Sequence, residues 1–147
     1  MSTKQKNIKA VNSYFSNVAS DYLSQSQKFP WSFLRNREAN IVTKILSNIC
    51  LNNVLELGSG AGYYTSILKS QGAKYIYAVD LSEAMLGNIK EKNVYKICID
   101  AEKLTLKKNF DTIFSAGMIE FLDNPSKIFL NAKFSKSLHT CKKHNVC

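Results

Sequence analysis

Three closely spaced glycines form the segment that points most clearly to chemistry. Gly58, Gly60 and Gly62 follow an apolar run at residues 54–57 and come directly before a helical pattern. Without Cβ atoms, Gly58 allows a tight turn, Gly60 leaves room for a ligand, and Gly62 lets the helix begin close to the sheet. A glycine loop between a strand and a helix is where an open α/β sheet binds a nucleotide. The segment therefore predicts a nucleotide site.

A carboxylate is expected to face this loop. Asp80 ends the next apolar run, at residues 75–79. In a doubly wound sheet this second strand lies beside the first, so Asp80 and the loop meet at one edge and the carboxylate can accept both ribose hydroxyls. The alternative role for Asp80 is that of a helix N-cap, but the glycine loop upstream favours ribose binding.

The kind of nucleoside follows from the residues around the glycines. The spacing is Gly-x-Gly-x-Gly, and Tyr63 occupies the third glycine position of the dinucleotide fingerprint Gly-x-Gly-x-x-Gly. Glu56 precedes the loop, where it would repel a diphosphate but suits a ligand that carries an ammonium group. These features favour an amino-acid nucleoside over NAD, and an NAD-dependent oxidoreductase remains the less favoured alternative.

The predicted elements alternate along the chain. Short apolar runs predict strands over residues 54–57, 75–79, 95–99 and 110–114, and helical spacing predicts helices over 10–23, 31–49, 63–70, 82–90 and 125–137. Residues 1–10 are expected to be a frayed polar arm. Strands that are apolar along their length and alternate with helices indicate a parallel sheet covered on both faces, the Rossmann-like doubly wound α/β class.

Four motifs in order resemble those of the class I S-adenosylmethionine-dependent methyltransferases, over roughly residues 10–138. The segment Glu56–Gly62 resembles the first motif, along the methionine part of the cofactor. The second matches residues 78–85, the third residues 97–102, and the fourth residues 110–118, beside the transferred methyl group. The resemblance implies cofactor contacts from Glu56, Gly58, Gly60, Gly62, Asp80 (ribose), Leu81 and Met85 (adenine), Asp100 and Ala101 (adenine), and Ser115. For Leu81 and Met85, an ordinary place in the core is an equal alternative.

The N-terminal segment from Tyr14 to Tyr22 resembles the lid helix that many small-molecule members place over the cofactor. The resemblance makes Tyr22 a candidate cofactor contact, and either Arg35 or Arg37 a candidate partner of the methionine carboxylate. It implies S-adenosyl-L-methionine as cofactor and methyl transfer to a small molecule. No general base stands out, although Glu120 and Asp123, just after the fourth strand, could reach a substrate.

The sequence departs from the family pattern after the fourth strand. The family fold has seven strands, whereas four are predicted here, in the order 3-2-1-4. We expect residues 1–30 to form the arm and lid-like helix, residues 31–138 an incomplete cofactor-binding domain, and residues 139–147 a polar tail. This pattern suggests a truncated or frameshifted product, so a non-catalytic fragment with a partial cofactor site is the alternative function. The exposed edge of strand 4 would be a template for self-association.

The composition and charge of the chain limit the kinds of partner that we expect. The chain has 147 residues, a net charge of +9 and no long apolar stretch or signal-peptide pattern, so we expect a cytoplasmic protein without a membrane span. The lysines are scattered and no stripe of interleaved aromatics appears, which makes nucleic acid a less favoured partner than a small molecule. Cys141, His144 and Cys147 offer three ligands where a structural zinc site needs four, so no metal is expected.

Overall fold

The computed structural model describes residues 3–19, 28, 30–105 and 107–126. Its central sheet consists of β1 (Asn53–Leu57), β2 (Tyr75–Asp80), β3 (Val94–Cys98) and β4 (Thr112–Ser115). The helices are α1 (Thr3–Val18), α3 (Trp31–Leu46), α4 (Tyr63–Ser70) and α5 (Glu83–Gly87), with short 3-10 turns η1 (Ala101–Lys103) and η2 (Ile119–Phe121). The strands and helices alternate from β1 onward, as the sequence predicts.

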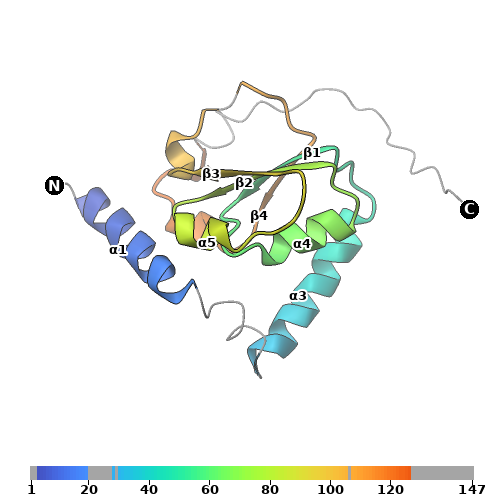
Figure 1. The fold of residues 1–147 in the computed structure, drawn as a ribbon, viewed down its shortest axis with the longest axis horizontal. Coiled ribbons are helices and arrows are strands. Elements are labelled where there is room, and N and C mark those ends of the chain that lie inside the picture. Colours follow the sequence, from blue (N-terminus) through green and yellow to red (C-terminus); the bar gives the residue numbers. More distant parts are fainter. Residues whose placement is uncertain (1–2, 20–27, 29, 106, 127–147) are drawn as a thin grey trace, which may run out of the picture.

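The sheet confirms the predicted topology. Its strand order is β3-β2-β1-β4, and every neighbouring pair is parallel. The register aligns Leu57 of β1 with Val79 of β2 and with Ser115 of β4. The carboxyl ends of the strands therefore meet at one edge, and the loops that follow them gather there (Figure 1).

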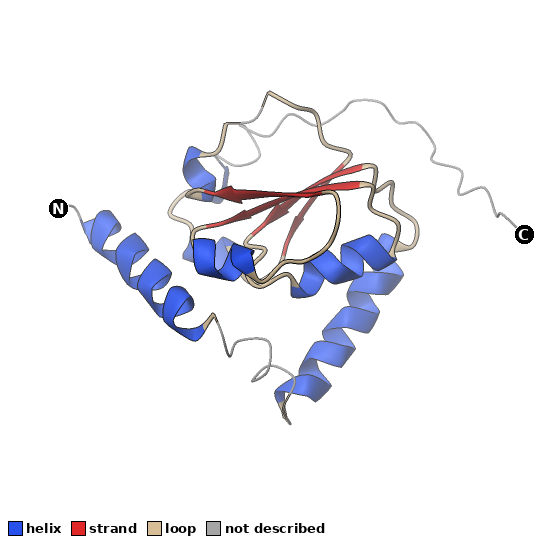
Figure 2. Ribbon diagram, in the orientation of Figure 1, coloured by secondary structure: helices blue, strands red, loops and turns tan. Residues whose placement is uncertain are grey.

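The two faces of the sheet are covered differently. Helices α3, α4 and α5 lie on one face (Figure 2), where Val54, Leu68 and Ile76 belong to one buried cluster. In the described part of the chain, the other face is covered by η1 and the segment that leads to β4. Leu104 and Phe110 of that segment pack against Leu55 in a second cluster. The segment between β3 and β4 thus covers this face of the sheet with a 3-10 turn and a loop. The helix expected over residues 125–137 lies outside the described residues beyond Ser126.

Several boundaries differ from the sequence prediction; helix α3, for example, ends at Leu46 and not at residue 49. Helix α1 begins at Thr3, so the prediction of a frayed arm over residues 1–10 is wrong from that residue onward. The helix extends this far because residues 3–18 contain neither Gly nor Pro, and each added residue gains a helical hydrogen bond. Helix α5 ends at Gly87, a poor helix former, and the Asn88 side chain bonds Ala84 and Ala19 carbonyls. Strand β4 begins at Thr112, since the side chain of Asp111 accepts the N–H of Asn53.

Within the described residues, no helix is long and apolar enough to cross a membrane. Among the residues that the structure describes, neither Cys50 nor Cys98 is in a disulfide. Their apolar sequence neighbours suggest core thiols, but Cys98 is exposed and Cys50 is half-buried. The three possible zinc ligands, Cys141, His144 and Cys147, lie outside the described part of the chain.

Gly62 provides a stability prediction. It caps α4 with φ of +91°, and a Cβ atom there would lie 2.8 Å from Cγ1 of Ile89. Left-handed backbone strain and the forced contact should together make Gly62→Ala destabilising by roughly 2 kcal/mol. Urea unfolding measures the effect. Gly72→Ala is the matched control, because φ there is +96° but nothing lies within 4 Å of the added Cβ. An equal loss in both variants would show that the Ile89 contact contributes nothing.

Candidate functional site

The glycine loop and Asp80 are held together by backbone hydrogen bonds. The N–H groups of Gly58 and Ser59 donate to the carbonyl oxygen of Val79, at 2.8 and 3.1 Å. The N–H of Gly60 donates to Oδ2 of Asp80 at 2.8 Å, and the N–H of Ser82 donates to Oδ1 at 2.9 Å. The carboxylate therefore fixes both loops in place, and each oxygen keeps a lone pair for a further donor.

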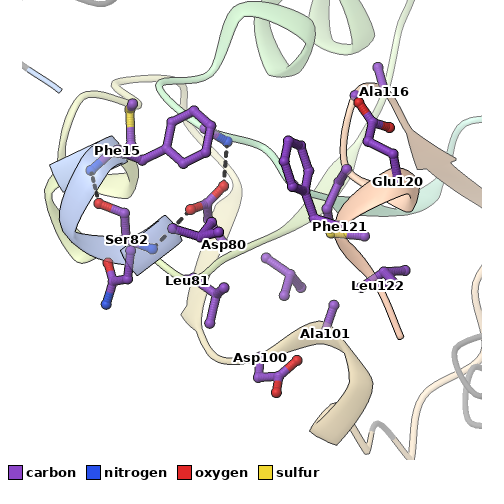
Figure 3. A pocket seen from close by; sticks show the side chains of 18 of the residues that line it. Phe15, Asp80, Leu81, Ser82, Asp100, Ala101, Ala116, Glu120, Phe121 and Leu122 are labelled. Carbon is purple, nitrogen blue, oxygen red and sulfur yellow. Dashed lines mark hydrogen bonds between the residues drawn. The ribbon is translucent and has the colours of Figure 1, made fainter. Parts of the chain in front are cut away.

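Asp80 is not the N-cap of the helix that follows it. That position belongs to Ser82, whose side chain accepts the N–H of Met85. The alternative role considered for Asp80 is therefore filled by its neighbour, and its carboxylate faces a cavity instead (Figure 3).

This cavity has a volume of about 780 Å³ and lies at the carboxyl ends of the strands. Its walls come from the glycine loop, the β2–α5 and β3–η1 loops, and the segment after β4, with α1 and α3 completing it (Figure 3). The predicted cofactor residues that line it are Gly58, Gly60, Asp80, Leu81, Met85, Asp100 and Ala101. A cleft of this size is suited to a ligand of nucleoside dimensions.

Two of the predicted residues, Gly62 and Ser115, do not line the cavity. Gly62 is buried under Ile89, at the start of α4. The hydroxyl of Ser115 is buried and has no hydrogen-bond partner among the described residues. Tyr22 lies outside the described part of the chain.

Glu56 is also absent from the cavity wall. Its side chain is 2% exposed, and Oε2 accepts a hydrogen bond from the Thr65 hydroxyl at 2.7 Å. Burial raises the pKa of this carboxyl group from 4.5 to about 8, the Thr65 bond opposes the rise, and the negative charges of Glu91 and Asp80 add to it. The group is therefore largely protonated at neutral pH.

Asp100 presents an unused acceptor at the cavity wall. Its Oδ1 accepts the N–H of Glu102 at 3.0 Å. Its Oδ2 is buried and has no hydrogen bond within the described residues, although the ammonium group of Lys103 lies 3.9 Å away. A buried carboxylate oxygen without a donor is costly, so a ligand with an N–H group at this place would be stabilised.

Helix α1 forms one side of the cavity. Phe15 lines it, and the hydroxyl of Ser16 lies 2.9 Å from that of Ser82 on the β2–α5 loop. Phe121, after β4, also lines the cavity, with its ring centroid 6.5 Å from that of Phe15 in an edge-to-face arrangement. Phe15 belongs to the segment Tyr14–Tyr22, which resembles a lid helix over the cofactor, whereas the sequence assigned Phe121 no role. Their approach is a tertiary contact that no local pattern could reveal.

Polar side chains gather at the end of the cavity nearest α3. Arg35 lines it, with its guanidinium 4.6 Å from the centroid of the Tyr63 ring, whereas Arg37 does not. The hydroxyl of Tyr64 donates to Oε2 of Glu38 at 3.1 Å, and both residues line the cavity. Partial burial and this hydrogen bond raise the pKa of Tyr64 to about 12. Tyr64 therefore stays protonated and cannot act as a base near neutral pH.

The segment after β4 contributes carboxylates, as expected. Glu120 and Asp123 both line the cavity. No group of three His, Cys, Asp or Glu side chains within the described residues could hold a metal ion. The cavity therefore combines an apolar floor, one buried acceptor and several carboxylates, a set that can bind, orient and desolvate a nucleoside and a second small molecule.

Comparison with known proteins gives a consistent result. A family model described as a methyltransferase domain matches residues 55–133, more than half of the chain. The malonyl-(acyl-carrier protein) O-methyltransferase of Bacillus anthracis is 35% identical over 83 residues, which are 53% of this chain and 31% of that protein. A tRNA U34 carboxymethyltransferase of Psychromonas ingrahamii is 30% identical over 80 residues, which are 49% of this chain and 24% of that protein. This chain therefore matches about a third or less of the length of these relatives.

Solved structures share the fold at low sequence identity. A DhpI complex with SAH (S-adenosylhomocysteine) has a TM-score of 0.70 at 23% identity, covering 86% of this chain and 63% of that one. Phosphoethanolamine N-methyltransferase 1 of Haemonchus contortus was solved with phosphoethanolamine and S-adenosylhomocysteine. It has a TM-score of 0.74 at 18% identity, and the match covers 91% of this chain and 31% of that one. These likenesses support the fold assignment.

Proposed function

This chain belongs to the methyltransferase domain family, and we propose that it binds S-adenosyl-L-methionine and transfers the methyl group to a small-molecule acceptor. The observation that carries the proposal is the contact between the glycine loop and Asp80 at the cavity wall. It brings the two sequence motifs for a nucleoside to one place. Since the chain spans only part of its relatives, the activity and the acceptor are proposals for this protein.

The nucleoside would lie along the β2 and β3 loops. The free lone pairs of Asp80 can accept the ribose hydroxyls, and Leu81, Met85 and Ala101 supply apolar surface for the adenine ring. Oδ2 of Asp100, a buried acceptor without a hydrogen bond in the described chain, suits the adenine amino group. The residues present therefore fit an adenosine-containing cofactor.

The amino-acid part would lie toward the glycine loop and α3. Gly58 and Gly60 line the cavity without Cβ atoms, and Arg35 offers a guanidinium for the carboxylate. The contact between Glu56 and the amino group stays a prediction, because Glu56 does not line the cavity. Gly62 would contribute to the cofactor site indirectly, by positioning the start of α4. Ser115 would contribute through its position at the end of β4. The role predicted for Tyr22 remains a prediction.

The bound cofactor supplies a methyl group on a sulfonium centre, ready for direct displacement. The protein then mainly orients the reactants and excludes water. Phe15, Met118 and Phe121 supply apolar cover at the cavity. Where an acceptor must lose a proton, Glu120 and Asp123 are the available carboxylates, whereas Tyr64 remains protonated.

The activity is tested by incubating the purified chain with S-adenosylmethionine and a panel of carboxylate, hydroxyl and amine acceptors. Malonyl thioesters come first, because malonyl-(acyl-carrier protein) O-methyltransferases are among the relatives. We expect S-adenosylhomocysteine to form only when an acceptor is present, as measured by mass spectrometry. Saturable cofactor binding without product on any acceptor would favour the alternative of a non-catalytic fragment.

Asp100 allows the nucleobase placement to be tested. We expect Asp100→Ala to weaken S-adenosylhomocysteine binding by about 1–2 kcal/mol, roughly 5- to 30-fold in Kd, because a buried hydrogen bond is lost. S-inosylhomocysteine, which lacks the amino group, should bind more weakly than S-adenosylhomocysteine to the unmodified protein and equally to the variant. A preference for the adenosyl compound that survives in Asp100→Ala would place the adenine elsewhere.

Two further predictions concern location and assembly. The cytoplasmic location remains a prediction. Strand β4 is an edge strand in the described sheet, and pairing of two copies through it remains a prediction. Light scattering over a range of protein concentrations measures the oligomeric state.

A further inference from the structure

Three tyrosines and a lysine lie side by side outside the cavity, with Tyr75, Tyr95 and Lys108 exposed and Tyr77 half-buried between them. Tyr77 of β2 and Tyr95 of β3 are direct register partners, and their rings stack with centroids 4.8 Å apart and planes at 24°. The Tyr75 ring lies 6.4 Å from that of Tyr95. The ammonium group of Lys108 lies 4.6 Å from the centroid of Tyr77 and 5.8 Å from that of Tyr75. We call these four residues the tyrosine face.

The tyrosine face lies on the side of the sheet opposite α4 and α5, because Tyr77 packs with the second cluster. Figure 2 shows α4 and α5 together on the other side of the sheet. Ile76 and Ala78, which alternate with the tyrosines along β2, pack into the cluster beneath the helices. Tyr77 packs instead with the second cluster, and its ring meets that of buried Phe110 edge to face. None of the four residues lines the cavity, which lies at the opposite ends of the strands.

The rings remain accessible in the described part of the chain. Tyr75 is 42% exposed and Tyr95 is 49% exposed. Strand β3, which carries Tyr95, is the edge strand of the described sheet. The stack of Tyr77 and Tyr95 therefore ends at an open edge, where another flat ring could extend it.

The charges around the patch are positive. Lys108 also donates a hydrogen bond to the hydroxyl of Tyr77, which holds its ammonium group over the rings. Lys107 is exposed beside it, and exposed Lys74 directly precedes Tyr75. Of the nearby carboxylates, Glu91 bonds to Ser66 on the helical side and Asp111 bonds to the backbone of Asn53. A ligand for this face should therefore carry flat rings and negative charge.

We propose that the tyrosine face binds single-stranded nucleic acid, with bases stacking on the exposed tyrosines and phosphates meeting the lysines. Stacking on aromatic side chains together with backbone contacts to a basic surface is how proteins bind single strands without strong sequence preference. A protein helix would bring an apolar face, which matches neither the phenolic hydroxyls nor the lysine ammonium groups. A duplex hides its bases, so it would not use the rings.

The proposal is tested by fluorescence anisotropy with a labelled dodecamer of uridine and one of thymidine, in low salt. Both should bind, and the affinity should fall as salt is raised. Tyr95→Ala should weaken binding between fivefold and a hundredfold, as expected for the loss of about one stacked base. Tyr95→Phe should retain most of the affinity, because the ring remains.

Matched controls separate this face from general effects. Tyr14→Ala removes another exposed tyrosine, on α1, and should leave oligonucleotide binding unchanged. Lys44→Gln, at an exposed position on α3, should weaken binding less than Lys108→Gln. The Tyr95, Lys108 and Lys44 variants should keep the unmodified affinity for S-adenosylhomocysteine, which reports a folded chain independently.

Several outcomes would overturn the proposal. The first is an affinity for single strands no higher than that for a duplex. The others are equal losses of oligonucleotide affinity in Tyr95→Ala and Tyr14→Ala, or an unchanged oligonucleotide affinity in Tyr95→Ala. A concentration-dependent dimer that dissociates on Tyr95→Ala would show instead that the face joins two copies of the chain.

Discussion

Replacing Asp80 by alanine is expected to weaken S-adenosylhomocysteine binding by about 2–3 kcal/mol, roughly 30- to 150-fold in Kd. The carboxylate lines the cavity and can accept ribose hydroxyls, so its loss removes charge-assisted hydrogen bonds to the ligand. It also releases the N–H groups of Gly60 and Ser82, which are held at 2.8 and 2.9 Å. The glycine loop would then lose part of its fixed geometry. Isothermal titration calorimetry measures the affinity.

Asp111→Ala is the matched control for this variant. Oδ2 of Asp111 accepts the N–H of Asn53 at 2.8 Å, so the substitution also removes a carboxylate that bonds to the backbone at a strand end. Asp111 does not line the cavity. We expect it to lower the free energy of unfolding without changing the affinity for S-adenosylhomocysteine. Equal losses of affinity in the two variants would remove Asp80 from the ligand site.

The second large effect is a fall in stability with rising pH, caused by Glu56. Its pKa in the folded chain is about 8, against 4.5 for an exposed group. Between these values the folded state holds a proton that the unfolded state has released. Protonation therefore stabilises the fold fully below about pH 4.5, and this contribution is lost as the pH rises through about 8. The free energy of unfolding should fall by on the order of 4 kcal/mol between about pH 5 and pH 8.5.

Glu56→Gln isolates this contribution. Glutamine keeps an oxygen that accepts the hydrogen bond of Thr65 but has no proton to lose near neutral pH. Urea unfolding of both proteins across this pH range should show a steep decline for the unmodified chain and a flatter one for the variant. Parallel curves would mean that Glu56 ionises in the folded protein much as it does in the unfolded one.

Much of the fold could be predicted because local signals agreed with one another. The apolar runs of β1 and β2 are bounded by glycines and by Asp80, and the parallel topology follows from the alternation of strands and helices. The wrong boundaries lie where local preference is weak. Residues 3–9 are polar except for Ile8 and contain no helix breaker. The end of α5 depends on the Asn88 bond to Ala19, a contact between distant segments.

The cavity was predictable where motifs report directly on backbone geometry. The glycine loop, Asp80 and Asp100 all lie at strand ends, so their convergence follows from a parallel sheet. The contact between Phe15 and Phe121 could not be predicted, because only folding brings α1 to the segment after β4. The same holds for the tyrosine face. Tyr75, Tyr77 and Tyr95 form no stripe in the sequence, and register pairing of β2 with β3 makes them neighbours.

The central claim is that the glycine loop and Asp80, the last residue of β2, together hold an adenosine-containing amino-acid ligand. The most direct measurement is a calorimetric titration of the unmodified chain with S-adenosylhomocysteine and, separately, with NAD. We predict saturable binding of one S-adenosylhomocysteine per chain and little or no heat with NAD. Tighter binding of NAD, or no binding of S-adenosylhomocysteine to the folded chain, would contradict the account.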